Sequence, residues 1–177
     1  KSTLINLIPS LYDVTEGVVL IDGVNVKDYN SHLLNKKIGY TPQRGVLFSG
    51  TVKSNINFGD NNADDETIKK SLSIAQASNF VSRMEGGVDG RIAQGGTNVS
   101  GGQKQRLSIA RAIARKPEIF IFDDSFSALD FKTDKKLRMA LNTHTDGITK
   151  FIEAQRIGTI KGADKIIVLE SGEMVGI

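Results

Sequence analysis

An apolar run that ends in two aspartates constrains the fold more than any other feature of these 177 residues. The run is EIFIF, Glu118–Phe122, and Asp123 and Asp124 follow it directly. An uninterrupted apolar strand is typical of a parallel sheet that is covered on both faces. Helical patterns flank the run, with SGGQKQRLSIARAIARKP before it and TDKKLRMALNTH after it. This alternation of strands and helices predicts an α/β fold built from βαβ units.

Two further regions carry hairpin signals. Asp22-Gly23 joins two short β-rich runs within Gly17–Tyr29, and a Ser-Gly pair at residues 171–172 joins two strand patterns near the end of the sequence. Asp-Gly between such runs favours a tight hairpin, because the turn needs residues with positive φ. We therefore expect a small antiparallel part near residues 17–29 beside the parallel sheet.

Helical patterns fill much of the remaining sequence. KSTLINLIPSLYD at the start has apolar residues at helical spacing, and Asp64–Met84 reads as one helix with acidic residues in its first turn. We expect a helical subdomain over about residues 55–115. KKIGYTPQ reads as a strand, and DGITKFIEA as a weaker strand in which Lys150 and Glu153 would face outward at a sheet edge.

Composition sets the broad class of protein. With 39% hydrophobic and 24% charged residues, the chain has ordinary globular proportions, and one domain over residues 1–177 is long enough to bury a core. The net charge of +3 is weak support for binding nucleic acid. The absence of cysteine excludes a disulfide framework and a thiolate metal site. No apolar run approaches the ~20 residues of a membrane span.

Two elements suggest a nucleotide site. Lys1, Ser2 and Thr3 open a helical pattern, as in the tail of a phosphate-binding P-loop, although a random surface triplet would read the same. Asp123 ends an apolar strand, which is where P-loop enzymes hold Mg²⁺, although it could also be a simple helix cap. The two elements occur in the order that a P-loop enzyme requires, and this favours the nucleotide site.

The segment VSGGQKQR, Val99–Arg106, begins a third helical pattern. Its two glycines allow close approach of another group, and Ser100 with Gln103 fits a capping box. Such a helix start attracts anions, because its N–H groups and the helix dipole point at the same place. The segment is thus either an ordinary capped helix or a contact for a phosphate.

VSGGQKQR resembles the signature motif of ATP-binding cassette (ABC) proteins. GYTPQRGVLFSGTVKSNI resembles the Q-loop region of exporter-type cassettes, SALD resembles the D-loop, and EAQRIGTIKGADKIIVLESGEMV resembles the switch region and final strands. These motifs span nearly the whole chain in family order. The resemblance implies a P-loop NTPase core with a mostly parallel sheet, a small antiparallel β subdomain and a helical subdomain carrying the signature. It also leads us to expect that the N-terminal strands and the glycine-rich part of the P-loop precede Lys1.

The resemblance further implies partners and site residues. In the family, two such domains stack head to tail and sandwich two ATP molecules, each between one P-loop and the other domain's signature helix. The implied ATP contacts are Lys1, Ser2, Thr3, Gln43, Ser100, Gly101, Gly102, Gln103 and Asp130. The implied Mg²⁺ ligands, direct or through water, are Ser2, Gln43 and Asp123. The catalytic positions are Asp124 and Gln155.

Both catalytic positions depart from the family pattern. Asp124 stands where active members have a glutamate that polarises the attacking water, and Gln155 stands where they have the switch histidine. Aspartate is one methylene shorter, and glutamine cannot become a cation. Together these changes suggest a site that holds ATP but hydrolyses it slowly, beside a signature in which only Val99 is unusual. The pattern resembles the degenerate half of a heterodimeric multidrug exporter, joined to transmembrane domains at the cytoplasmic face of the cell membrane.

Two alternatives remain open. One is a soluble ABC ATPase of DNA repair or chromosome maintenance, although such proteins usually insert a coiled coil or zinc module that this sequence lacks. The other is a dimerisation module that nucleotide holds together without turnover. Five basic residues in and after the signature segment could form a stripe that binds nucleic acid, but they are interpreted as the solvated face of an amphipathic helix, so no nucleic-acid partner is expected. These basic residues are Lys104, Arg106, Arg111, Arg115 and Lys116.

Overall fold

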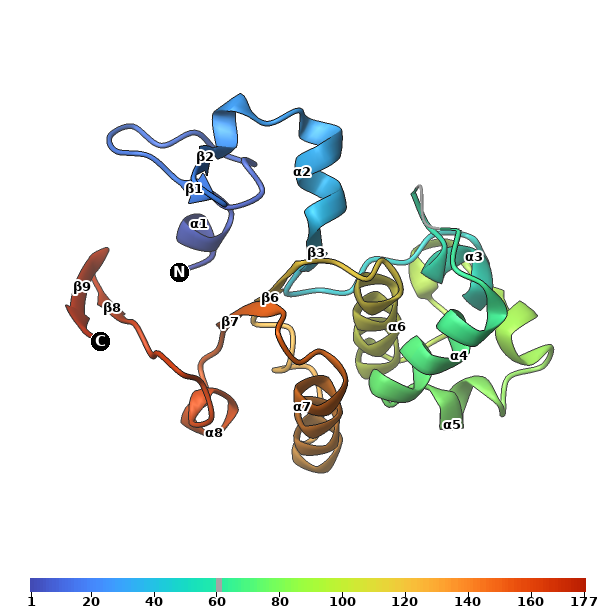
Figure 1. Cartoon of the computed structure of the whole chain (residues 1–177). Coiled ribbons are helices and arrows are strands. Elements are labelled where there is room, and N and C mark those ends of the chain that lie inside the picture. The colour runs from blue at the N-terminus through green and yellow to red at the C-terminus, as the bar shows by residue number, and fades with distance from the viewer. Residues whose placement is uncertain (60–61) are drawn as a thin grey trace.

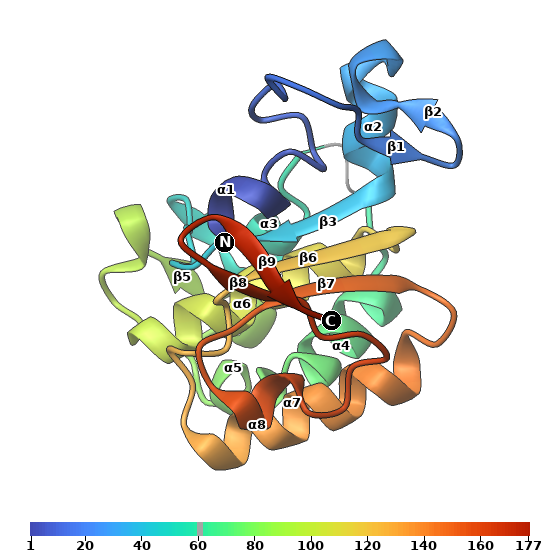
Figure 2. The same cartoon turned by 90° about the vertical axis from the view of Figure 1, so that its left-hand side faces the viewer.

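A three-stranded parallel sheet lies at the centre of the computed structural model, which describes residues 1–59 and 62–177. Its strands are β3 (Ile38–Thr41), β6 (Ile119–Asp123) and β7 (Thr149–Glu153), in the order β3-β6-β7. Both pairings are parallel, and Figure 2 shows the three strands side by side. The α/β fold expected from the sequence is confirmed, and the central strand is the apolar run that ends in the two aspartates.

The central strand is buried on both faces. Phe120 and Phe122 point into the larger core cluster, where the ring of Phe122 lies 5.5 Å from that of Phe120 and 5.1 Å from that of Phe126. Ile121 points the other way, into a smaller cluster that includes Ile38. Successive side chains of a strand face opposite sides, so a strand covered on both faces must be apolar throughout.

Four helices gather on one side of the sheet, as Figure 1 shows. They are α3 (Val52–Ile56), α4 (Asp65–Ile74), α5 (Ser78–Val81) and α6 (Gly101–Ala114). The buried face of α6 includes Leu107, Ile109 and Ile113. The expected helical subdomain, about residues 55–115, includes residues 60 and 61, which lie outside the described residues.

The helix expected over Asp64–Met84 is wrong as a single element. The chain leaves the helical conformation at Gln76, whose φ is 57°, and α5 begins two residues later. The backbone carbonyl of Gln76 accepts a hydrogen bond of 2.6 Å from Arg106 Nη1 on α6. This tertiary contact fixes a break that the periodicity of the segment does not reveal.

The predicted hairpins are confirmed. β1 (Leu20–Ile21) pairs with β2 (Val24–Asn25), and both turn residues have positive φ, 52° at Asp22 and 78° at Gly23. β8 (Val168–Glu170) pairs with β9 (Glu173–Gly176) through the Ser-Gly turn at residues 171–172. A third antiparallel pair, β4 (Gly50–Thr51) with β5 (Arg91–Ile92), was not predicted.

The N-terminal helix is shorter than expected. α1 covers only Ser2–Ile5, and turns follow it as far as Ser10, whose φ is 56°. Pro9 contributes to the early end, because it has no N–H to donate to the carbonyl of Ile5 four residues before it. The remaining helices are α2 (Ser31–Lys37), α7 (Phe131–His144), α8 (Ile157–Ile160), η1 (Val26–Asp28), η2 (Gly87–Asp89) and η3 (Gln94–Gly96). In the part of the chain that the structure describes, no helix has the length and apolarity that crossing a membrane requires.

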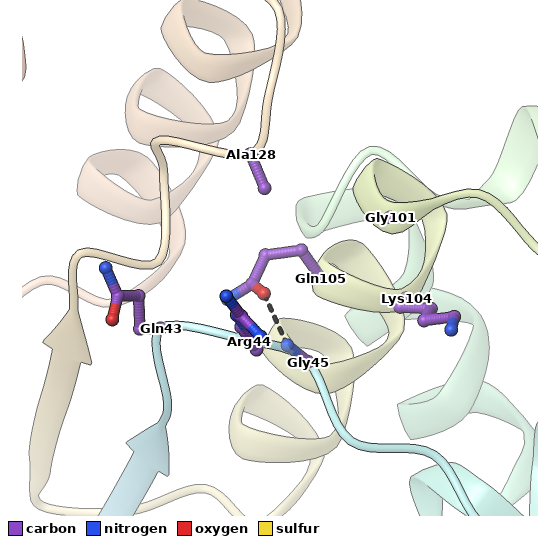
Figure 3. Close-up of a pocket in the computed structure, with 7 residues that line it drawn as sticks. All are labelled: Gln43, Arg44, Gly45, Gly101, Lys104, Gln105 and Ala128. Atoms are coloured by element: carbon purple, nitrogen blue, oxygen red, sulfur yellow. Dashed lines mark hydrogen bonds between the residues drawn. The ribbon is translucent and has the colours of Figure 1, made fainter. Parts of the chain in front are cut away.

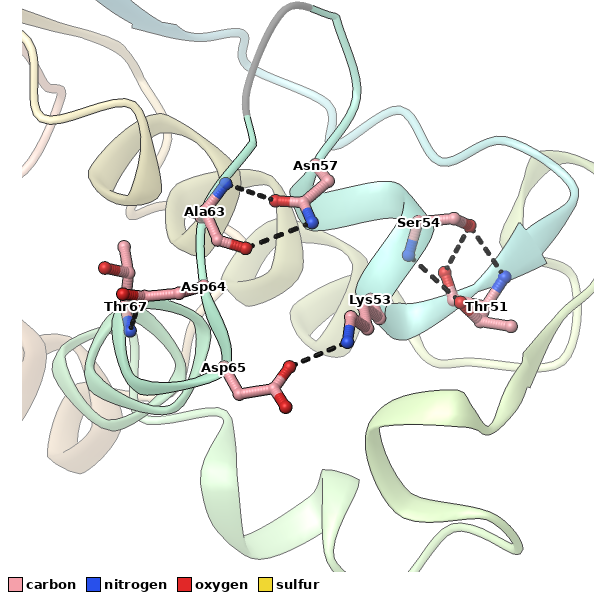
Figure 4. A network of polar contacts seen from close by, with 8 residues as sticks. All are labelled: Thr51, Lys53, Ser54, Asn57, Ala63, Asp64, Asp65 and Thr67. Atoms are coloured by element: carbon pink, nitrogen blue, oxygen red, sulfur yellow. Dashed lines mark hydrogen bonds and ion pairs between the residues drawn. The ribbon is translucent and has the colours of Figure 1, made fainter.

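A capping box starts α3 and gives a first testable prediction. Thr51 Oγ1 accepts from the Ser54 amide at 3.0 Å, and Ser54 Oγ accepts from the Thr51 amide at 2.8 Å (Figure 4). Thr51→Ala should destabilise α3 by about 1 kcal/mol, because an orphan N–H at the helix start loses its acceptor. Amide hydrogen exchange of α3 in the intact protein measures this change. The control is Ser49→Ala, at an exposed position just before the box, and an equal effect of both substitutions would contradict the prediction.

Candidate nucleotide site

Polar side chains converge at the carboxyl end of the parallel sheet. Asp123 is the last residue of β6, and Asp124 follows it. Gln43 lies two residues beyond β3, and Gln155 lies two residues beyond β7. Parallel strands end at one edge, which is where ligands bind in open α/β sheets. The register of the sheet thus brings together residues that are up to 112 positions apart in the chain (155 − 43).

Asp123 accepts hydrogen bonds on both carboxylate oxygens. Ser2 Oγ donates to Oδ1 at 2.7 Å, and the Tyr40 hydroxyl lies 3.2 Å from Oδ2. Burial, together with the neighbouring Asp123 carboxylate, raises the pKa of Tyr40 to about 12. Tyr40 therefore remains a neutral hydroxyl at physiological pH, able to donate to the carboxylate.

Asp124 is held by two amides. Gln43 Nε2 donates to Oδ2 at 3.3 Å, and Gln155 Nε2 donates to the same oxygen at 3.1 Å. The Asp124 side chain is buried, and its backbone N–H donates to the Glu153 carbonyl at 3.1 Å. The two positions that depart from the family pattern thus meet at one carboxylate oxygen. Sequence reasoning did not foresee this contact, since it depends on side-chain geometry across three strands.

Lys1 and Ser2 lie beside this group, and Lys1, Ser2 and Thr3 are all exposed. Lys1 Nζ donates to the Ala154 carbonyl at 3.3 Å and lies 3.4 Å from Glu153 Oε1. The expectation that Glu153 faces outward is wrong, because its side chain is only 10% exposed and turns toward Lys1. A signal was available in the sequence, since a carboxylate at the end of a strand next to β6 falls beside Asp123 in a parallel register.

The donor set at this edge fits Mg²⁺. The Ser2 hydroxyl, the Asp123 carboxylate and the Gln43 amide oxygen are hard oxygen donors of the kind that Mg²⁺ takes. Within residues 1–59 and 62–177, no group of three or more His, Cys, Asp or Glu could hold a metal by itself. A magnesium site built from one or two carboxylates, waters and substrate phosphates does not need such a cluster.

The predicted signature residues form a second group at the start of α6. The capping box is confirmed, with the Gln103 amide 3.3 Å from Ser100 Oγ and the Ser100 amide 2.8 Å from Gln103 Oε1. A Cβ at Gly101 would meet nothing within 4 Å, so this turn offers open backbone to an approaching group. A Cβ at Gly102 would lie 3.3 Å from the Ala128 carbonyl, so Gly102 instead allows the D-loop to pack closely.

Asp130 belongs to this second group and caps α7. Its Oδ1 accepts from the Thr133 amide at 3.0 Å, and hydrogen bonds from the side chain and then the amide of Thr133 lower the pKa of the exposed Asp130 carboxyl. A hollow of about 300 Å³ separates the two groups of residues (Figure 3). Its lining comes from the loop after β3, from α6 and from the D-loop, and consists of Gln43, Arg44, Gly45, Gly101, Lys104, Gln105 and Ala128.

The basic residues of α6 are not all a solvated face, and that interpretation is wrong for two of them. The guanidinium of Arg106 lies 4.7 Å from the centre of the Phe80 ring, and it donates a hydrogen bond to the Gln76 carbonyl. Arg111 donates three hydrogen bonds to the chain segments beside α6, and burial lowers the pKa of its guanidinium to about 10. Both guanidinium groups therefore contact other segments of this chain. The expectation that the chain has no nucleic-acid partner stays a prediction.

Comparison with known proteins identifies the family. Residues 1–127 match the family described as ABC transporter. An uncharacterized ABC transporter ATP-binding protein of Mycobacterium tuberculosis is 46% identical over 179 residues, covering 99% of this chain and 30% of the relative. A putative multidrug export ATP-binding/permease protein of Staphylococcus aureus is 45% identical over 175 residues, with the same two coverages. This chain thus spans about 30% of the length of these curated relatives.

A solved structure agrees with the sequence relatives. The structure of a bacterial Atm1-family ABC exporter with ATP bound matches this fold with a TM-score of 0.94 at 33% identity. The match covers 99% of this chain and 31% of that one. The parallel sheet, the capped signature helix and the residues at the sheet edge therefore have one explanation: the chain belongs to the ABC transporter family, as an ATP-binding domain of the exporter type.

Proposed function

We propose that this chain is the nucleotide-binding domain of a heterodimeric ABC exporter, and that its own pocket binds Mg-ATP but hydrolyses it slowly. The partner's pocket, completed by the signature turn of this chain, performs most of the hydrolysis that powers export. The observation that carries the proposal is the Asp124 carboxylate, whose Oδ2 accepts from the amides of both Gln43 and Gln155.

The pocket suits Mg-ATP. Lys1 would contact the β- and γ-phosphates with Ser2 and Thr3 beside it, and Ser2, Gln43 and Asp123 would serve Mg²⁺. When bound, the ion neutralises phosphate charge and orients the triphosphate. Support comes from the short contact between Ser2 and Asp123, and from the ATP bound in the similar exporter.

Two features of Asp124 and one of Gln155 argue for slow hydrolysis. Its side chain is one methylene shorter than the family glutamate, so its carboxylate reaches less far toward an attacking water. Its Oδ2 already accepts two N–H bonds, from Gln43 and Gln155, so both acceptor positions of that oxygen are occupied and it is not available to an attacking water. Gln155 offers no positive charge to the γ-phosphate. Orienting or activating water is typically worth ~10²–10⁴-fold in rate, so a pocket without it still binds ATP but hydrolyses it slowly.

The signature turn, which this chain would offer to a partner, keeps the family pattern better than the chain's own pocket does. Ser100, Gly101, Gly102 and Gln103 would contact the γ-phosphate held by the partner's P-loop, and Asp130 would reach across the interface. The open backbone at Gly101 supports this role. Because this chain spans about 30% of its relatives, transmembrane domains on the same full-length chain are part of the proposal. The domain would then lie at the cytoplasmic face of the cell membrane.

Single-turnover hydrolysis by the assembled full-length pair tests the proposal. Replacing the partner's catalytic glutamate with glutamine should lower turnover by ~10²-fold or more, whereas Asp124→Asn should lower it by only about twofold. Equal losses would show that both pockets hydrolyse ATP, and the proposal would fail. Absence of turnover in the unmodified pair would instead favour a dimerisation module that nucleotide holds together. Brisk hydrolysis by purified homodimers of the complete chain would also contradict the heterodimeric reading.

A further inference from the structure

One buried side chain, Gln105, joins the loop that carries Gln43 to the signature helix. Gln105 is 1% exposed, and both ends of its amide are engaged by the loop. Its Oε1 accepts from the Gly45 amide at 2.7 Å, the contact drawn in Figure 3, and its Nε2 donates to the Pro42 carbonyl at 2.9 Å. These two backbone groups lie on either side of Gln43, so the bridge fixes the loop at the point where Gln43 projects.

The loop and the helix are also in direct backbone contact. A Cβ at Gly45 would lie 2.7 Å from the Lys104 carbonyl oxygen and 2.9 Å from the Gln105 amide nitrogen. No side chain fits in that space, so the loop cannot slide along α6 without opening the contact. Gln105 stands one helical turn after Gly101, which places the bridge directly beneath the exposed signature turn.

A continuous series of contacts therefore runs from one nucleotide surface to the other. It begins at Asp124, passes to Gln43 through their hydrogen bond, and crosses from Pro42 to Gln105 and α6. At the other side of the loop, Ser125 Oγ donates to the Thr41 carbonyl at 2.8 Å and holds the end of β3 against the residues after β6. Hydrogen-bond networks and packed elements of this kind carry energetic coupling between sites.

We propose that Gln105 is a positioning residue that couples the chain's own ATP pocket to the signature turn that it offers to the partner. When Mg-ATP fills the pocket and Gln43 contacts its Mg²⁺, the loop moves, and Gln105 transmits that movement to α6. This inference rests on the proposed function, because it assigns the signature turn of this chain to the catalytic pocket of the partner. It also gives a role to the ATP that this chain's own pocket hydrolyses slowly. That ATP would set the position of this chain's signature turn in the partner's pocket.

A double-mutant cycle in the assembled full-length pair tests the coupling. The variants are Gln43→Ala, Gln105→Met and the two together, and the readout is single-turnover hydrolysis at the partner's pocket. Methionine keeps the length of glutamine and removes both hydrogen bonds. Each single change should lower turnover ~10-fold, and the double variant should also be ~10-fold slower, because both changes break one link. A double variant that is ~100-fold slower, or a Gln105→Met variant with unchanged turnover, would overturn the inference.

Glycine variants and a core variant separate coupling from general loss of stability. Gly45→Ala should reproduce Gln105→Met, since the added methyl group separates the same two backbones, and it replaces Gln105→Met in the cycle if that variant does not assemble. Gly176→Ala is the matched control, because a Cβ there meets only the Val168 Cβ, at an ordinary contact distance of 4.0 Å. Ile109→Val, a buried change on the same helix, should leave turnover unaltered at temperatures where the pair is folded. If Ile109→Val lowers turnover as much as Gln105→Met does, the role of Gln105 is only structural.

The same preparation distinguishes the two proposals. With the partner's catalytic glutamate replaced, the pair should retain almost no turnover if the proposed function is right. Substantial remaining hydrolysis would refute the slow own pocket without deciding whether Gln43 and Gln105 act through one link. Additivity in the cycle would refute the link and leave the assignment of the slow pocket intact.

Discussion

Asp124→Glu combined with Gln155→His should raise hydrolysis at this chain's own pocket by ~10²-fold. The glutamate adds the missing methylene and moves its carboxylate out toward the attacking water. The histidine removes one of the two amide donors that hold Oδ2 of Asp124, and it can carry a positive charge toward the γ-phosphate. The measurement is single-turnover hydrolysis in a pair whose partner lacks its own catalytic glutamate, so that only this pocket contributes.

The single variants and a distant carboxylate provide the controls. Asp124→Glu alone should give a smaller gain, because Gln155 still donates to position 124 and no imidazole is present. Asp164→Glu makes the same chemical change at an exposed position far along the chain and should have no effect. If the double variant remains as slow as the parent, the short carboxylate and the missing histidine are not what limit this pocket.

Arg111→Ala should lower the stability of the loop after β3 and of α3 by about 3 kcal/mol. Arg111 Nε donates to the Asn55 carbonyl at 2.7 Å, Nη1 to the Val46 carbonyl at 3.0 Å, and Nη2 to Asn55 Oδ1 at 3.1 Å. Removing the guanidinium leaves these acceptors without their donor, at a typical cost of 1–3 kcal/mol for each one that stays buried. The guanidinium also lies 5.6 Å and 5.4 Å from the stacked rings of Phe48 and Phe58, whose contact it supports.

Hydrogen exchange measures this loss directly. Amides of residues 46–56 should exchange ~100-fold faster in the Arg111→Ala protein, while those of β6 should change little. Arg111→Lys should fall between the parent and the alanine variant, because an ammonium group cannot make the forked contacts of a guanidinium. Arg83→Ala removes an exposed arginine and is the matched control. Equal exchange in the Arg83 and Arg111 variants would mean that the three hydrogen bonds contribute nothing measurable.

Local chemistry explains which parts of the fold could be predicted. An apolar strand, a pair of turn residues with positive φ and a capping box each depend on a few neighbouring residues, and β6, both hairpins and the start of α6 were confirmed. The break after α4 depends instead on a hydrogen bond from Arg106, 30 positions away. Helical periodicity places a charged residue on a face of its helix, but it does not show whether aromatic rings from another segment cover that residue.

The candidate site was predictable as a set of residues but not as a set of contacts. Family order predicted that Gln43, Asp123, Asp124 and Gln155 lie together, and the parallel register brings them to one edge, while their roles toward the nucleotide stay predictions. The sharing of one Asp124 oxygen by two amides depends on rotamers that no spacing encodes. Gln105 was missed for a related reason, since a buried glutamine within a helix resembles any other polar residue until the loop above it is known.

The backbone at Asp124 offers a reason for the choice of residue at that position. Its φ of 44° lies in the left-handed region, which aspartate and asparagine adopt more often than most other residues that have a side chain. A glutamate at this position would have a strained backbone conformation, and strained residues of this kind are common at active sites. Under the proposed function, in which the partner's pocket performs most of the hydrolysis, this turn does not have to hold the longer acid, and aspartate fits its backbone conformation.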